Sequence, residues 1–402
     1  MVELYTPGAP LQELQARIEK LQKAIQDKGV GGALIVQKTD LFYFASTSQQ
    51  GWLYVPEFGL PLLMVFKEFD RARIESTLEQ VISVVSPKKI PGILAERGYQ
   101  LPAVLGLELD VLPANLYFQF ADIFKTSTIV DVSTEIRLIR AVKSAYEIEI
   151  LRQAALLSDT VAAKVPELLQ PGKTEVALAG ELEAYARSLG HQGIIRMRLF
   201  GSELFYGHLM SGPAAAVPSY LASPTGGQGV SPTISQGAGF NKIKKNEPVL
   251  FDYAFAFQGY ISDHARIFSI GALPDELMWA HEAMLKIQEE TKKRARPGIP
   301  SGDIYEMMVA MAESMGYGEF FMGVGDRRIR FTGHGVGLEL DEFPFLAKGQ
   351  KLPLASGMVI ALEPKVILPG KGVVGIENTM LLTDTGLESL STIDDHITIL
   401  PE

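Results

Sequence analysis

The sequence predicts an α/β domain at the N-terminus followed by a larger α+β domain. The chain has 402 residues, which is more than one hydrophobic core normally organises. In the first 135 residues, short apolar segments alternate with helical segments, an order typical of α/β domains. From residue 144 on, the order is paired helices, strands, paired helices and strands.

In the N-terminal part, an amphipathic helix is expected over 10–28, because Leu11, Leu14 and Ile18 recur at helical spacing before Gly29. The remaining expected elements are strands at 32–36, 60–66, 81–85 and 103–108 and helices at 69–79 and 114–124. This part contains no metal-ligand cluster, phosphate loop or nucleophile motif. It is therefore interpreted as structural or regulatory, with domain ranges of 1–140 and 141–402.

In the C-terminal part, Ser144 and Glu147 form a capping box that opens a long helix. The other expected helices cover 174–190, 274–296 and 301–316, the last capped by Ser301, and strands are expected near 194–200, 205–210, 328–331, 358–364, 373–383 and 397–400. Residues 211–247 are dense in Gly, Pro and Ser. Such a long segment is either a binding loop or a mobile connector.

Composition excludes several classes of protein. The chain is 47% hydrophobic and 21% charged, as is normal for a globular protein, and its net charge of −10 argues against a nucleic-acid surface. The absence of cysteine excludes disulfides, thiolate metal sites and a Cys nucleophile. No signal peptide or membrane-spanning apolar run is visible, so the expectation is a cytoplasmic protein without membrane partners.

Residues 251–263 are expected to form a β-hairpin around which the C-terminal domain is organised. Aromatic and small residues alternate from Phe251 to Phe257, and Gln258-Gly259 supplies a two-residue turn. In this register Asp252 faces residue 265, and Asp263 lies diagonally across from Asp252 on the same face. Two carboxylates thus converge on a surface of small apolar groups, where a bound cation would remove their repulsion. The alternative is that one pairs with Arg266 and the other is solvated.

Three further residues carry candidate chemistry. His334 is flanked by glycines that let the backbone approach closely, while Glu363 and Glu377 end or interrupt apolar strands. Each has an alternative explanation as a structural hydrogen bond or salt bridge. Together with Asp252 and Asp263, however, they form a set of four carboxylates and one imidazole that suits two bridged divalent cations.

These residues resemble the motifs of the creatinase, prolidase, aminopeptidase P and methionine aminopeptidase superfamily. The hairpin resembles its Asp-x-x-x-x-x-x-Gly-Tyr-x-x-Asp-x-x-Arg motif, Gly333-His334-Gly its histidine motif, Glu363-Pro364 its Glu-Pro motif, and Gly375-Ile-Glu377-Asn its final glutamate motif. The segment 136–148 is similar to the linker of the two-domain members. The resemblance implies a pita-bread catalytic domain and an N-terminal domain that takes part in dimerisation.

The resemblance also implies roles for the residues. Asp252 would bind one metal, Asp263 and Glu377 would bridge both, and His334 and Glu363 would hold the second. A bridging hydroxide would attack the peptide bond while Glu363 assists proton transfer. The ions are expected to be Mn²⁺ or Co²⁺, with Zn²⁺ or Fe²⁺ as alternatives. The expected function is removal of the residue ahead of proline or cleavage of Xaa-Pro dipeptides, by a cytoplasmic homodimer acting on small peptides.

Several positions depart from the family pattern. Ser219 and Asp341 stand where the family usually has histidines that contact substrate, Gly375 stands where an arginine is common, and Lys365 stands where a glycine is common. We expect Ser219 and Tyr220 to bind substrate and Glu363 and Asp341 to act in catalysis. His208 is a possible catalytic substitute for a lost histidine; the alternative is that it is an ordinary packed or surface histidine. The alternative function is a diverged member that hydrolyses a non-peptide amide or only binds a ligand. A metal-free, creatinase-like activity is disfavoured because all five metal-ligand positions are filled.

Overall fold

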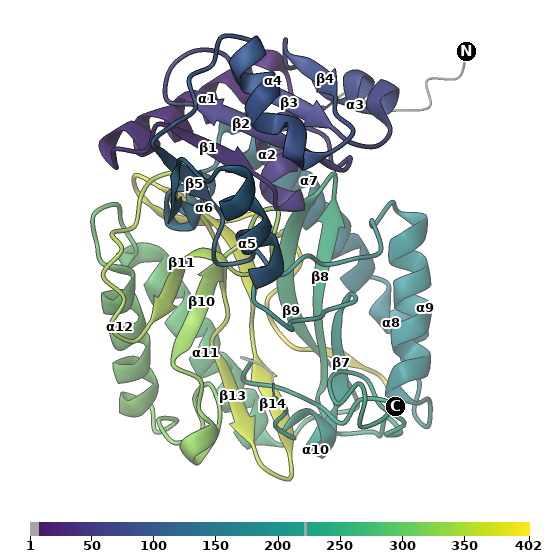
Figure 1. Cartoon of the computed structure of the whole chain (residues 1–402). Coiled ribbons are helices and arrows are strands. Elements are labelled where there is room, and N and C mark those ends of the chain that lie inside the picture. Colours follow the sequence, from purple (N-terminus) through teal and green to yellow (C-terminus); the bar gives the residue numbers. More distant parts are fainter. Residues whose placement is uncertain (1–7, 221–222) are drawn as a thin grey trace. The chain divides into compact units, whose positions relative to one another are not determined.

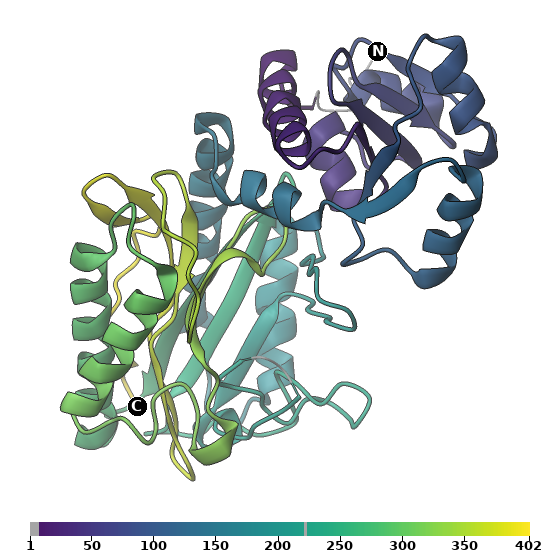
Figure 2. The same cartoon turned by 60° about the vertical axis from the view of Figure 1, so that its left-hand side comes forward.

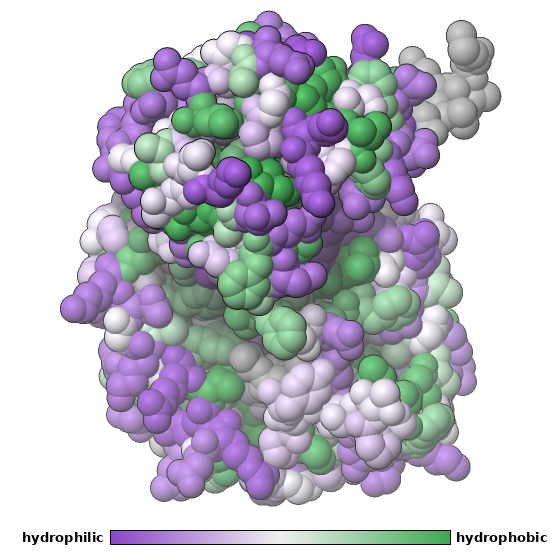
Figure 3. Space-filling view, in the orientation of Figure 1, coloured by the Kyte–Doolittle hydropathy of each residue, from purple (hydrophilic) through white to green (hydrophobic). Residues whose placement is uncertain are grey.

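The computed structural model describes residues 8–220 and 223–402. Contacts divide the chain into two compact units, Met1–Arg140 and Ala141–Glu402 (Figure 1). Apolar and polar side chains are interspersed on the visible face of each unit (Figure 3), which is normal for a protein surface. In the described part of the chain, no helix combines the length and apolar character needed to cross a membrane.

The N-terminal unit is built on a six-stranded sheet with the order β4-β3-β2-β1-β5-β6. The β1–β2 and β2–β3 pairs are antiparallel and the other pairs are parallel. Its elements are α1 (Leu11–Asp27), β1 (Gly32–Ile35), α2 (Lys38–Ala45), β2 (Gly51–Pro56), β3 (Leu62–Val65), α3 (Phe69–Glu75), β4 (Val81–Ser83), α4 (Ile90–Glu96), β5 (Val104–Leu107), α5 (Ala114–Ile123), β6 (Thr128–Asp131) and α6 (Ser133–Ala141, which ends one residue into the second unit). The predicted α/β character is therefore confirmed. Strand β2 escaped prediction because all its residues are buried, so its sequence lacks the apolar–polar alternation of a half-buried strand.

The second unit contains three sheets, with strand orders β17-β9-β8-β7, β11-β10-β12-β15-β16 and β13-β14. Its strands are β7 (Gly207–Ser211), β8 (Val249–Phe257), β9 (Tyr260–Ile270), β10 (Phe331–Gly335), β11 (Glu342–Ala347), β12 (Val359–Leu362), β13 (Lys365–Leu368), β14 (Gly372–Gly375), β15 (Asn378–Thr383), β16 (Gly386–Ser389) and β17 (Thr398–Leu400). Its helices are α7 (Ala145–Ala162), α8 (Val165–Leu168), α9 (Glu175–Ser188), α10 (Gly212–Ala215), α11 (Asp275–Arg294) and α12 (Ser301–Ser314).

Two apolar layers hold the helices of this unit on the sheets. One cluster joins α7, α8 and α9 to the aromatic face of β7–β9, and the other joins α11 and α12 to β11–β16. Figure 2 shows the green helices α11 and α12 on one side of the strands and the teal helices on the other. The inner faces of the sheets are left to line a site between the two helical layers.

The expected helix starts at Ser144 and Thr174 are confirmed. Ser144 accepts from the Glu147 amide, Glu147 returns the bond, and the Thr174 side chain accepts from the Ala177 amide. The expected cap at Ser301 is wrong by one residue, since Pro300 holds the N-cap position. The Ser301 hydroxyl is not needed there, because the Ser301 and Gly302 amides donate to the backbone of 350–352.

Three strand predictions are also wrong. The segment 328–331 follows the 3-10 helix Gly325–Arg327 and contributes only Phe331 to β10. The segment 194–200 forms only an isolated bridge, Ile195 to Leu204, and its apolar side chains at Leu199 and Phe200 are exposed instead of packed. The segment 373–383 is not one strand, because it breaks between Gly375 and Asn378 into β14 and β15, which belong to different sheets. This break carries Glu377, whose backbone bridges to Ala265 of the hairpin.

The long segment 211–247 is tied down near both ends by one buried carboxylate. Glu175, which is fully buried, accepts from the Ser211 amide at 2.7 Å, the Gly239 amide at 3.0 Å and the Asn241 side-chain amide at 3.0 Å. These three hydrogen bonds link the start of the segment to residues near its end. The segment therefore has a fixed base beside the site, and its mobility remains a prediction.

Candidate metal and active site

The hairpin has the predicted register. Phe257 pairs with Tyr260, Phe255 with Ser262 and Asp252 with Ala265, and both turn residues have positive φ, as expected for this kind of two-residue turn. The aromatic face packs in the cluster with α7–α9. The opposite face carries Asp252 and Asp263 into the site.

The predicted alternative in which Arg266 neutralises one of these carboxylates is wrong. The Arg266 guanidinium donates to Asn378 Oδ1 at 2.8 Å and to the Glu377 carbonyl at 3.0 Å, and it pairs with Asp395 at 3.0 Å. Residue 266 is paired with Phe251 in the ladder and thus lies one position away from the Asp252 pair. Alternation along the strand sends its side chain to the opposite face.

His334 lies on β10 in an orientation suited to metal binding. A Cβ atom on Gly333 would lie 2.5 Å from the Ala361 carbonyl oxygen, so the neighbouring strand approaches closely only because glycine is present. The His334 Nδ1–H donates to the Leu340 carbonyl at 2.9 Å, which leaves the Nε2 lone pair free to act as a ligand. Nε2 lies 3.8 Å from Asp263 Oδ2 and 3.9 Å from Glu363 Oε1.

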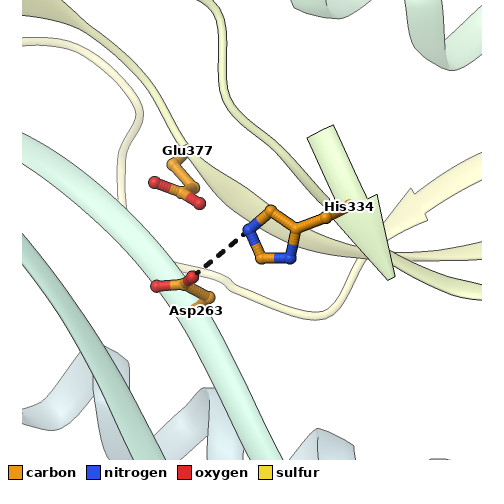
Figure 4. Close-up of side chains that lie close together, drawn as sticks. All are labelled: Asp263, His334 and Glu377. Carbon is orange, nitrogen blue, oxygen red and sulfur yellow. Dashed lines mark ion pairs between the residues drawn. The ribbon is translucent and has the colours of Figure 1, made fainter. Parts of the chain in front are cut away.

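Asp263, His334 and Glu377 form a buried cluster in which one ligand atom from each residue lies within 4.8 Å of the others. Figure 4 shows the carboxylates of Asp263 and Glu377 on the same side of the imidazole, with the Asp263 oxygen directed at the His334 nitrogen. Two carboxylates and one imidazole with its second nitrogen anchored suit a divalent ion. The donor set therefore fits one metal ion.

Lys365 reaches into the same site, although sequence analysis noted it only as a departure from the family pattern. Its Nζ donates to Glu377 Oε2 at 2.6 Å, Asp252 Oδ2 at 2.9 Å and Glu363 Oε2 at 3.2 Å. Its side chain is only 2% exposed. The available signal was a lysine at the start of the strand segment Lys365–Leu368, which is otherwise apolar. An ammonium thus neutralises carboxylates that were expected to bind metal.

Burial dominates the ionisation of this cluster. It raises the pKa of Asp263 well above its usual range, and the charges of Glu377 and Asp252 raise it further. It also raises the pKa of Glu377 to about 8, against the opposing effect of Lys365. Burial alone would lower the pKa of Lys365, but Asp252, Glu377 and Glu363 outweigh it and hold that pKa well above its usual value. Burial and mutual repulsion thus make it costly for these carboxylates to be ionised together, and a bound cation would favour their charged forms.

The three residues of the cluster line a cavity of about 510 Å³ within the second unit. The predicted site residues that line it are His208, Tyr220, Asp252, Asp263, His334, Asp341, Glu363 and Glu377. Ser219 is not one of the lining residues, and its hydroxyl donates to the Ser235 carbonyl at 2.5 Å. Asp341 Oδ1 lies 3.7 Å from His334 Nδ1, which is too far for a hydrogen bond, so Asp341 acts on the imidazole only through its charge.

His208 is the residue best placed to replace a lost histidine. It lies on β7 directly opposite Asp252, and its Nε2 is buried with no hydrogen-bond partner among the described residues. Burial lowers its pKa, so the ring is neutral near pH 7. An unpartnered buried nitrogen is costly, and a polar group of a bound ligand would satisfy it.

Comparison with known families agrees with this geometry. Residues 149–384, more than half of the chain, match metallopeptidase family M24, and residues 17–142 match the creatinase/prolidase N-terminal domain. The chain belongs to metallopeptidase family M24. This M24 protein therefore has the two-domain organisation of the creatinase/prolidase group.

Relatives of this M24 protein match along nearly their whole length. It is 26% identical over 391 residues to an Xaa-Pro dipeptidase of Pyrococcus furiosus, covering 96% of this chain and 100% of the relative. It is 27% identical over 402 residues to an Xaa-Pro dipeptidase of Lactobacillus delbrueckii subsp. lactis, covering 96% and 99%.

Solved structures show the same fold. The Xaa-Pro dipeptidase from Bacillus anthracis superposes with a TM-score of 0.82 at 23% identity, covering 96% of this chain and 100% of that one. The X-Pro aminopeptidase from Thermotoga maritima gives 0.78 at 24% identity, with coverages of 95% and 99%. The M24 protein therefore has the expected pita-bread fold in its C-terminal part.

Proposed function

We propose that this protein is a metal-dependent peptidase that cleaves the bond preceding proline, either in Xaa-Pro dipeptides or at the N-terminal residue of longer peptides. The observation that carries the proposal is the buried Asp263–His334–Glu377 cluster in the wall of a cavity, in a chain of family M24. Relatives aligned over 96% of the chain bear the name Xaa-Pro dipeptidase.

The proposal requires at least the ion held by Asp263, His334 and Glu377. Mn²⁺ and Co²⁺ suit this oxygen-rich set better than Zn²⁺, and Fe²⁺ is a further candidate. When bound, such an ion supplies a Lewis acid for the scissile carbonyl and lowers the pKa of water. Two ions with Asp252 as a ligand remain the prediction from the family motifs.

The chain's own residues supply proton transfer and a dry environment. Glu363 Oε1 faces His334 Nε2 at 3.9 Å, so the Glu363 carboxylate is placed to take a proton from water and return it to the leaving amine. Leu340 and Phe331 form an apolar part of the cavity wall, where excluding water strengthens these electrostatic contacts. His208 is placed to donate from Nε2 to a substrate oxygen.

The alternative of a non-peptide amidase or a ligand-binding protein is not favoured. It was motivated by the loss of two family histidines at Ser219 and Asp341. His208 in the cavity wall offers a replacement imidazole, and the relatives named Xaa-Pro dipeptidase align with this chain over 99–100% of their length. The proposal further includes a cytoplasmic location, a homodimer and small peptides as substrates. It includes no nucleic-acid or membrane partner, and the net charge of −10 argues against nucleic-acid binding.

The test is cleavage of a mixed peptide library by Mn²⁺- or Co²⁺-loaded protein, read by mass spectrometry. We expect loss of single N-terminal residues ahead of proline, or cleavage of Xaa-Pro dipeptides only. His334→Ala should abolish cleavage, whereas His396→Ala, at a side chain that is 64% exposed, should leave it unchanged. An untouched library with metal verifiably bound would refute the proposal.

A further inference from the structure

The ammonium group of Lys365 lies among the residues that were expected to bind metal. The Lys365 ammonium is within 3.2 Å of oxygens from Asp252, Glu363 and Glu377. These residues come from β8, from the end of β12 and from the break between β14 and β15. Three carboxylates from separate segments of the chain therefore converge on one ammonium.

The backbone is shaped to hold this lysine in place. Lys365 pairs directly with Gly375 across β13 and β14. A Cβ atom on Gly375 would lie 2.6 Å from Lys365 Cα and 3.0 Å from its Cγ, and Gly375 has a φ of +150°. The glycine thus makes room for the lysine stem. The two departures from the family pattern, Lys365 and Gly375, therefore lie directly opposite each other.

A metal ion and this ammonium cannot share the position. A divalent ion binds carboxylate oxygens at roughly 2.0–2.6 Å, whereas the ammonium already lies 2.6–3.2 Å from the same three groups. An ion placed among these oxygens would overlap Nζ and repel its charge. The lysine side chain is only 2% exposed. Moving it out of the site to admit a second ion would therefore expose its buried aliphatic stem.

The neighbouring position remains available for metal. Lys365 contacts Oε2 of both Glu363 and Glu377, while Oε1 of Glu363 faces His334. Asp252 is directed at the ammonium through Oδ2 and does not belong to the Asp263–His334–Glu377 cluster. The carboxylates are thus divided between an ammonium position and a metal position.

We propose that the Lys365 ammonium permanently fills one of the two cation positions of this site, so that the protein binds a single divalent ion, at Asp263, His334 and Glu377. This inference deepens the proposed function and rests on it for the identity of the bound group as a divalent metal. The lysine keeps Asp252, Glu363 and Glu377 in place with or without metal. The second cation position is thus occupied by a side chain of the protein, and no metal ion binds there.

The test is metal stoichiometry, measured by equilibrium dialysis against Mn²⁺ followed by elemental analysis of the protein. We expect one ion per chain for the wild type and for Asp252→Asn, two for Lys365→Gly, and none for His334→Ala. Lys371→Ala is the matched control and should retain one ion. Lys371 is half exposed, and its ammonium pairs with Glu276 at a distance of 2.6 Å, outside the site. Electron paramagnetic resonance should show isolated Mn²⁺ in the wild type and an exchange-coupled pair in Lys365→Gly.

The wild-type result alone decides the central claim, so the test does not depend on the folding of any variant. Two ions per wild-type chain, or none, would overturn the inference. One ion in a folded Lys365→Gly protein would also overturn it, because the lysine would then not be what excludes the second ion. Failure of the proposed function is a separate outcome: a library left uncleaved by protein with one bound ion refutes the peptidase and leaves the stoichiometry intact.

Discussion

Replacing Lys365 by methionine should strongly destabilise the second unit in the absence of metal. Methionine keeps most of the volume of the lysine stem, so the variant removes the charge without opening a large cavity. The lost contacts are those of Nζ with Glu377 at 2.6 Å, Asp252 at 2.9 Å and Glu363 at 3.2 Å. The carboxylates would be left close together with no cation between them.

The expected magnitude follows from the burial of these groups. Removing one partner of a buried ion pair costs about 3–5 kcal/mol, because the remaining charge is uncompensated. Lys365 has three partners and 2% exposure, so we expect the free energy of unfolding to fall by an amount in the upper part of that range. In this variant Mn²⁺ can take the vacated position, and at 100 times its dissociation constant a ligand restores about 2.7 kcal/mol.

The assay is urea unfolding followed by circular dichroism, with EDTA or with excess Mn²⁺. Because the chain has two units, two transitions are expected, and hydrogen exchange of residues 359–383 identifies the one that shifts. Lys371→Met is the control, since exposed pairs contribute about 0–1 kcal/mol. If Lys365→Met lost no more stability in EDTA than Lys371→Met, the ammonium would not be holding the site together and the reasoning would be wrong.

Three further changes test separate parts of the structure. His208→Ala should lower kcat/KM about 10²–10³-fold, as expected for loss of a transition-state donor, while the metal content stays unchanged; equal activity would exclude His208 from catalysis. His191 is fully buried, and burial lowers its pKa from 6.5 to about 4, while its Nδ1 accepts from the Gly193 amide at 2.9 Å. Between these two pH values the unfolded chain binds the extra proton and the native chain does not, so stability should fall by up to roughly 3 kcal/mol as the pH drops through this window. Denaturant titrations from pH 7 to 4 should show a flatter dependence for His191→Gln, and an unchanged slope would contradict the assignment. Gly375→Ala places a Cβ 2.4 Å from the Pro364 carbonyl oxygen and 2.6 Å from Lys365 Cα, so its thermal unfolding should reveal a loss of about 1–3 kcal/mol, with wild-type stability as the contrary result.

Local patterns in the sequence were sufficient for the hairpin and for the main helices. The period of two along the strands and the two-residue turn at Gln258-Gly259 together place Asp252 and Asp263 on one face, because side-chain direction alternates along a strand and the turn fixes the register. The capping box at Ser144 likewise depends only on residues three apart. The motif residues also indicated the family and a metal-binding site before any fold was known.

Only the tertiary structure determined which basic side chain pairs with each carboxylate of the site. Asp252 and Lys365 are 113 residues apart in sequence, and Arg266, the nearer candidate, turned out to face Asp395 instead. The break that carries Glu377 depends on β14 and β15 joining different sheets. Such contacts are set by the packing of distant strands, since a local pattern determines the face of a residue but not the residue opposite it.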